Sequence, residues 1–99
     1  MPSVFRDVDP RELRVPTSRP SGADTYKLHR QIALFGANAD DMPPIWVNEG
    51  TDGALVIANG VTRATRIAKL NPGRLVPVEI IAKVRRSVGH LPKIGDLLS

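Results

Sequence analysis

The sequence contains no cysteine among its 99 residues, which excludes disulfides, a thiol nucleophile and a thiolate metal site. Aromatic residues are also scarce, so the core must be largely aliphatic; they are Phe5, Tyr26, Phe35 and Trp46. The two histidines, His29 and His90, are far apart in the sequence, and without carboxylate ligands they are too few to hold zinc.

Long hydrophobic runs are absent as well, since no apolar segment approaches the ~20 residues needed to cross a bilayer. The first residues have no apolar signal-peptide segment. We therefore expect no membrane partner and a cytoplasmic location. Acidic residues are outnumbered by Lys and Arg, 10 to 14, which gives a formal net charge of +4. This balance favours phosphorylated or acidic partners, including nucleic acid.

The length suits a single domain over residues 1–99, with a core at about 5–82 and a basic tail at 83–99. Local patterns predict a small α/β (α+β) fold with a mixed sheet that contains a β-hairpin and a β-α-β unit. The predicted elements are a strand at 5–8, a helical turn at 9–13, a loop at 14–22, a helix capped by Asp24 that runs to about Phe35, a hairpin at 45–58, a helix after Gly60 that runs to about Leu70, a strand at 75–81 and a final helical turn at 93–98.

Two details of this pattern can be tested directly in the structure. Residues 54–81 form the predicted β-α-β unit, whose crossover would be right-handed if its strands were parallel. In the hairpin, strand alternation directs Trp46 away from Ile45 and Val47. We expect Trp46 to pack on a neighbouring helix, with stacking on a nucleic-acid base as the alternative.

The most informative stretch is Ala54–Ile67, in which a short apolar strand turns directly into a helix. Asn59 is predicted to cap that helix, and Gly60 allows another group to approach the backbone closely. The free N–H groups and the positive end of the helix dipole favour an anion at this point, above all a phosphate. Arg63 adds a planar, charged donor fork one turn later. The alternative is an ordinary capped helix with a solvated arginine.

The order of these motifs resembles the ParB N-terminal and sulfiredoxin-like superfamily, which includes ParB-like nucleases. The match is strongest at Ile57–Arg66, with its Gly-x-x-Arg, followed by Leu75–Val78, and Pro44–Val47 is similar to the family's Gln-Pro-Ile/Leu-x-Val strand. The resemblance implies a phosphate held at the Gly-x-x-Arg turn and, as cofactor, a nucleoside triphosphate with Mg²⁺. The site residues expected from the turn and the resemblance together are Arg19, Asn59, Gly60, Thr62 and Arg63.

One departure from the family pattern bears on catalysis. Val61 stands where ParB-type proteins have an acidic residue and where sulfiredoxins have their catalytic cysteine, so sulfiredoxin chemistry is excluded. Asp40 and Asp41 in the loop before the hairpin are the candidate catalytic acids, because Mg²⁺ bound with phosphates needs only one or two carboxylates. The alternative is that both are solvated loop acids, and no metal site is assigned. Glu12 and His29 are further candidates for an acid or base.

The sequence leaves two classes of function open. The first is a ParB-like nucleotide- or phosphate-binding domain with a phosphoryl-transfer or toxin-like nuclease activity. The second is a catalytically silent domain that binds a protein partner or nucleic acid. Direct binding of nucleic acid would weaken steeply with salt, and its expected contacts are Arg66, Arg74, Arg85 and Arg86.

Overall fold

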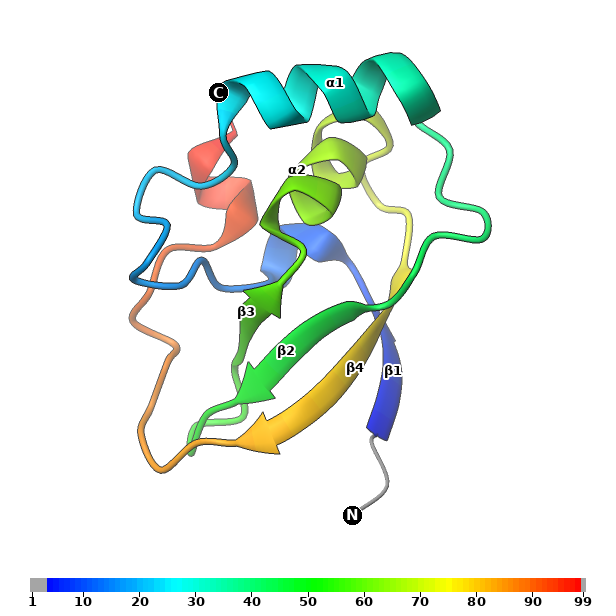
Figure 1. The fold of residues 1–99 in the computed structure, drawn as a ribbon. Helices are drawn as coiled ribbons and strands as arrows, with labels where there is room; N and C mark the ends of the chain where they lie inside the picture. Colours follow the sequence, from blue (N-terminus) through cyan, green and yellow to red (C-terminus); the bar gives the residue numbers. More distant parts are fainter. Residues whose placement is uncertain (1–3, 99) are drawn as a thin grey trace.

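A computed structural model describes residues 4–98 (Figure 1). Its elements are β1 (Val4–Val8), the 3₁₀ helix η1 (Pro10–Glu12), α1 (Thr25–Phe35), β2 (Ile45–Glu49), β3 (Leu55–Asn59), α2 (Val61–Leu70), β4 (Val76–Lys83) and the 3₁₀ helix η2 (Ile94–Leu97). Their order and type are those that the sequence predicts. No helix within this part of the chain combines the length and the apolar character that crossing a bilayer requires.

The four strands form one mixed sheet in the order β1-β4-β2-β3. β2 and β4 are parallel, and the two outer pairs are antiparallel. The predicted mixed α+β architecture with its β2–β3 hairpin is confirmed. β3, α2 and β4 follow one another in the chain as predicted, but β3 and β4 are not neighbours, because β2 lies between them. They also run antiparallel, so the rule for a right-handed parallel crossover does not apply to this unit. The short hairpin places β3 on one edge of β2, so β4 can pair only with the other edge.

Helix α1 begins and ends at residues that the sequence identifies as helix boundaries. The Asp24 side chain accepts a hydrogen bond from the Lys27 amide at 3.0 Å and caps α1, as predicted. Gly36, at a φ of 57°, ends this helix. α2 buries Ala64, Ile67 and Ala68 along one side.

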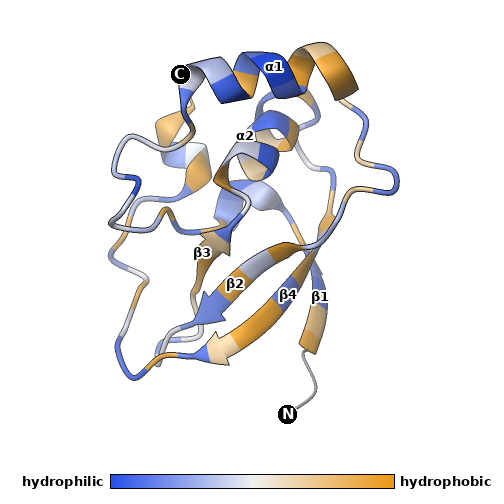
Figure 2. Cartoon of the chain, in the orientation of Figure 1, coloured by the Kyte–Doolittle hydropathy of each residue, from blue (hydrophilic) through white to orange (hydrophobic). Residues whose placement is uncertain are grey.

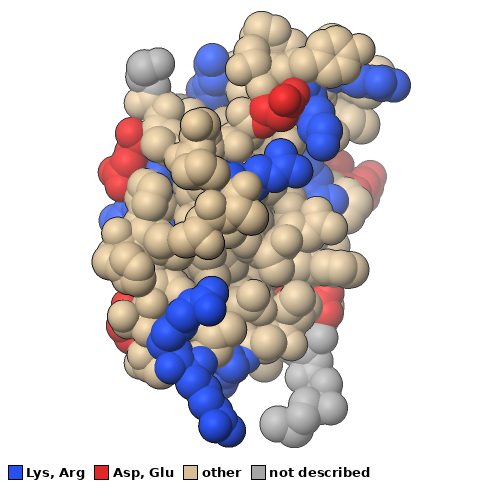
Figure 3. Space-filling model, turned by 60° about the vertical axis from the view of Figure 1, so that its left-hand side comes forward, with Lys and Arg blue, Asp and Glu red and all other residues tan. Residues whose placement is uncertain are grey.

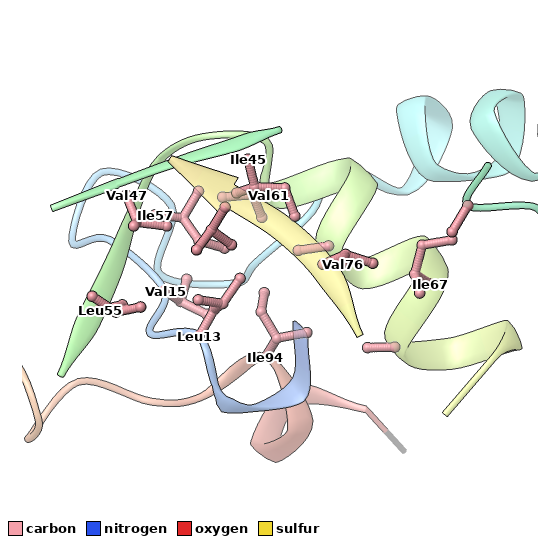
Figure 4. Packing of buried hydrophobic residues seen from close by; sticks show 14 of the residues in the cluster. Leu13, Val15, Ile45, Val47, Leu55, Ile57, Val61, Ile67, Val76 and Ile94 are labelled. Carbon is pink, nitrogen blue, oxygen red and sulfur yellow. The ribbon is translucent and has the colours of Figure 1, made fainter. Parts of the chain in front are cut away.

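The core lies between the inner face of the sheet, α2 and the two 3₁₀ helices (Figure 4). Its members are almost all aliphatic, and Figure 2 shows apolar residues concentrated on the strands, whereas α1 is mixed. Ile94 in η2 is 1% exposed and belongs to this core. The core therefore includes a residue beyond 82, because the tail returns to cover the sheet.

Asp52 in the hairpin turn fastens this tail to the sheet. Its carboxylate accepts backbone hydrogen bonds from Gly89 at 2.8 Å and from Val88 at 3.3 Å. Hydrogen bonds from the Gly89, Val88 and Ala54 amides lower the pKa of Asp52 below its ordinary value. Because the carboxylate form is favoured in the fold, its contribution to stability is complete above the unfolded pKa of about 3.9. That contribution is lost as the pH falls through the folded pKa.

We therefore expect Asp52→Ala to be less stable than wild type at pH 6 and to lose less stability on acidification. Urea unfolding at steps between pH 6 and pH 2 measures the difference between the two proteins. This difference should shrink as the pH falls. A difference that is independent of pH would show that the carboxylate charge does not hold the tail.

Trp46 lies on the face of the sheet opposite the core. Ile45 and Val47 are fully buried beneath α2, whereas the Trp46 side chain between them is 47% exposed. The expectation that it packs on a helix was wrong, because α2 packs on the other face of the sheet and α1 packs on α2 (Figure 1).

Candidate functional site

The junction of β3 and α2 leaves the start of the helix without a side-chain cap. Gly60 occupies the cap position at a φ of 117°, and no side chain bonds there. The prediction that Asn59 caps α2 was wrong, because Asn59 is still the last residue of β3 and pairs with Trp46. The first bond of the helix runs from the Ala64 amide to the Gly60 carbonyl at 2.9 Å. The preceding N–H groups have no acceptor within the helix and favour an anion.

A cavity of about 450 Å³ opens at this junction. The loop after η1, the polar side of α1, the end of β3 and the first turn of α2 all contribute to it. The residues that line it are Pro16, Ser18, Arg19, Lys27, Gln31, Ala58, Asn59, Gly60, Val61, Thr62 and Arg63. The structure therefore brings together all five residues of the predicted phosphate site.

Lys27 and Gln31 were not predicted as site residues, although both line the cavity. They lie four residues apart on α1, so they share one face of that helix. This spacing was visible in the sequence, but nothing in the sequence indicated that this face of α1 lies over the start of α2.

The cavity is cationic. Arg19, Lys27 and Arg63 line it together, and none of its lining residues is Asp or Glu. The positive end of the α2 dipole adds to this charge. The arrangement suits a ligand with one or more negative charges. It offers no carboxylate that could act as a general base or bind a metal within the cavity.

The Arg63 side chain folds back over Gly60. Its Nη2 atom donates a long hydrogen bond of 3.4 Å to the Pro44 carbonyl, and its buried Nε atom has no partner among residues 4–98. Burial lowers the pKa of Arg63 from its ordinary value. An arginine nevertheless keeps its charge at neutral pH. A half-buried guanidinium with spare donors is suited to binding an anion.

Asp40 and Asp41 lie in a neighbouring cavity of about 240 Å³. This second cavity shares Gln31 and Arg63 with the first, but the two acids do not line the first cavity. Asp40 also pairs with Arg74 at 3.1 Å. No group of three or more potential metal ligands occurs among residues 4–98. Of the other candidates, Glu12 pairs with Lys93 at 2.8 Å and His29 is exposed on α1.

Arg66 cannot serve as a nucleic-acid contact, because it is 2% exposed. Its Nη1 atom donates to the Gly36 carbonyl at 2.7 Å and to the Asn38 carbonyl at 2.8 Å. Its guanidinium also lies 5.3 Å from the centre of the Phe35 ring. The prediction for Arg66 was therefore wrong: its charge is used to hold the loop that follows α1.

The other predicted nucleic-acid contacts remain on the surface. Arg85 and Arg86 are exposed just after β4, and neither lines the cavity at Gly60. Figure 3 shows one group of Lys and Arg side chains at the lower end of that view, while other charges of both signs are scattered above it. On this face, the basic side chains do not form one continuous stripe.

No protein-family model matches the sequence, and the search of curated proteins finds no match either. The ParB-like resemblance therefore stays a prediction from short motifs.

Proposed function

We propose that this protein is a ParB-like module that binds a phosphate-bearing ligand of the nucleotide class at the Gly60–Arg63 turn. The observation that carries the proposal is the convergence of an uncapped helix start and three cationic side chains in one cavity without a carboxylate. The cavity of about 450 Å³ is in the range of small-molecule sites, so it has room for more than inorganic phosphate.

Each part of the cavity has a distinct role in this proposal. The amides of Val61 and Thr62 donate to phosphate oxygens, and the Thr62 hydroxyl is a further donor. Arg63, on the first turn of α2, contacts the same phosphate. Arg19 on the loop after η1 and Lys27 on α1 contact the ligand from the other walls of the cavity. Backbone amides and long cationic side chains together are the usual means of binding phosphate at a helix start.

The donor set of this cavity does not suit a protein-bound Mg²⁺ ion. Mg²⁺ prefers carboxylate oxygens and water, and no carboxylate lines the cavity. We therefore propose binding without catalysis. Val61, which occupies the position of the acidic residue in ParB-type proteins, supports the same conclusion.

Phosphoryl transfer or nuclease activity is the second candidate, because Asp40 and Asp41 line the adjacent cavity that shares Arg63. We expect Asp40→Asn and Asp41→Asn to leave ligand binding intact. If either variant abolished hydrolysis of the bound nucleotide or cleavage of DNA, the protein would be an enzyme. Absence of turnover in wild type, with and without Mg²⁺, would exclude this candidate.

The proposal predicts a rise in the melting temperature of wild type with CTP, ATP or GTP, measured with and without Mg²⁺. A ligand at about 100 times its Kd adds about 2.7 kcal/mol to the stability of the fold. For a domain of this size each kcal/mol moves Tm by about 4–8 °C, so a shift of roughly 10–20 °C is expected. Arg63→Ala and Lys27→Ala should lose most of it.

Arg30→Ala is the matched control, because Arg30 is on the same helix as Lys27 but does not line the cavity. It should retain the full shift. Lys27→Ala keeps the test valid if Arg63→Ala fails to fold, because the Lys27 side chain is exposed and its removal should not disturb the fold. The proposal fails if no nucleotide raises Tm in wild type, or if Arg30→Ala loses as much of the shift as Lys27→Ala.

A further inference from the structure

The face of the sheet that points away from the core carries exposed aromatic and acidic side chains. Phe5 is 61% exposed, Trp46 is 47% exposed and Ile81 is 45% exposed. Their partly buried neighbours on β4 are Pro77 and Glu79. We call the set Phe5, Asp7, Trp46, Pro77, Glu79 and Ile81 the outer sheet face.

The strand register places the two aromatic side chains on either side of a carboxylate. Glu79 on β4 pairs with Phe5 on β1 and with Trp46 on β2. Directly paired residues point to the same side of a sheet, and neighbouring strands are about 4.8 Å apart. The two aromatic residues therefore flank Glu79 in one row, with about 10 Å between their backbones.

This face is acidic, although the protein as a whole is basic. Asp7 pairs with Pro77 in the next row and adds a second carboxylate. Within residues 4–98, neither Asp7 nor Glu79 forms an ion pair or a side-chain hydrogen bond. Two uncompensated carboxylates beside two aromatic rings attract a cation, because aromatic rings bind Lys and Arg through their negative faces. The same two carboxylates repel nucleic-acid phosphates.

The edge of the sheet beside this face is also open. β1 pairs only with β4, and its other edge has no partner strand among the described residues. The opposite edge of the sheet is different, because the backbone of Arg14 pairs with β3. The Arg14 N–H donates to the Leu55 carbonyl at 2.8 Å, and the Arg14 carbonyl accepts from the Ile57 N–H at 3.0 Å. An unpaired edge strand accepts an extended peptide by main-chain hydrogen bonding.

We propose that the outer sheet face binds an extended basic segment of a partner protein. The segment lies along β1 and directs an Arg or Lys side chain between Phe5 and Trp46, over the Glu79 carboxylate. Arginine suits this position best, because its planar guanidinium stacks on a ring while it pairs with a carboxylate. This proposal does not depend on phosphate binding at Gly60, whose lining residues are different.

Trp46 is the only tryptophan in the sequence, so its fluorescence reports directly on this face. The probe is a short capped Gly-Ser peptide with two arginines, and its matched control is the same peptide with citrulline, which has the shape of arginine without the charge. We expect the arginine peptide to change Trp46 emission saturably. The citrulline peptide should bind at least tenfold more weakly.

Two variants locate the binding. Glu79→Gln removes the charge with little change in shape, and Phe5→Ala removes one ring from an exposed edge position. Each should weaken the arginine peptide at least tenfold. Tyr26→Ala and Glu12→Gln are the controls, because they remove an exposed aromatic ring and an exposed carboxylate elsewhere. Both should leave the affinity unchanged.

The proposal is overturned if the citrulline peptide binds equally well or if Glu79→Gln has no effect. An oligo-dT strand that quenches Trp46 more strongly than the arginine peptide would instead identify a base-stacking surface. Concentration-dependent dimerisation that Phe5→Ala abolishes, without competition from the arginine peptide, would identify a second copy of this chain as the occupant. Either result would also overturn the proposal.

Discussion

Replacing Gly60 by alanine is expected to lower the free energy of unfolding by about 2–4 kcal/mol. Gly60 has a φ of 117°, which an L side chain rarely adopts. A Cβ atom there would lie 2.9 Å from Nη2 of Arg63 and 3.2 Å from Cγ2 of Ile45. The arginine could move away, but Ile45 is fully buried and has no room to do so.

Gly53→Ala is the matched control for this effect. Gly53 also has a positive φ, of 80°, but a Cβ atom there would meet nothing within 4 Å. It should therefore cost only the backbone strain, about 1 kcal/mol. Urea unfolding of both variants separates strain from steric overlap. Equal losses would show that the crowding around Gly60 contributes nothing.

The same variant connects the fold to the proposed ligand. At temperatures where Gly60→Ala is folded, the added methyl group should displace the Arg63 guanidinium from its position over the start of α2. We therefore expect its nucleotide-dependent rise in Tm to be smaller than that of wild type. Gly53→Ala should keep the full rise, because its hairpin turn does not line the cavity.

Arg66→Ala is expected to destabilise the protein by about 2–4 kcal/mol. Arg66 is buried, and its removal leaves the Gly36 and Asn38 carbonyls without their donor. A buried polar group that loses its partner costs about 1–3 kcal/mol, and the cavity left by a large side chain adds to this loss. The Phe35 ring also loses its cationic neighbour.

Arg74→Ala provides the comparison, because Arg74 contacts the same loop through an ion pair with Asp40. Both side chains of that pair are well exposed, so its loss should cost less than about 1 kcal/mol. Both variants are unfolded in urea. If the dependence of the unfolding free energy on urea concentration is the same for both, the difference between them is a difference in stability and not a change in the unfolded state. If Arg66→Ala costs no more than Arg74→Ala, the buried arginine is not what holds the loop.

The ends of the secondary-structure elements were largely decided by the sequence itself. Asp24 and Gly36 bound α1 because a carboxylate can accept from the first helical N–H groups and glycine tolerates a positive φ. Pro77 is the second residue of β4, where the strand pairs with β1 alone: pairing with β2 begins only at Val78, after the residue that lacks an N–H. These are local effects, and they act within a few residues.

The five residues of the predicted phosphate site were likewise identified from local signals and the motif resemblance, and the structure brings them to one cavity. One detail was misjudged within that stretch. Asn59 and Gly60 are both suitable helix caps, and the choice between them depends on how far β3 extends. Because Asn59 pairs with Trp46, it remains in the strand, and Gly60 occupies the cap position of α2.

Only the tertiary structure decided which distant residues meet. Arg66 was expected on the surface as a nucleic-acid contact, but the loop after α1 covers it. The carbonyl oxygens of that loop accept hydrogen bonds from its guanidinium and offset the cost of burying it. Lys27 reaches the cavity because α1 packs on α2. Trp46 is exposed because α2 and the two 3₁₀ helices cover the other face of the sheet. The sequence determined the local geometry through short-range hydrogen bonding and backbone sterics. The packing of segments far apart in the chain determined which charges face the ligand and which are buried.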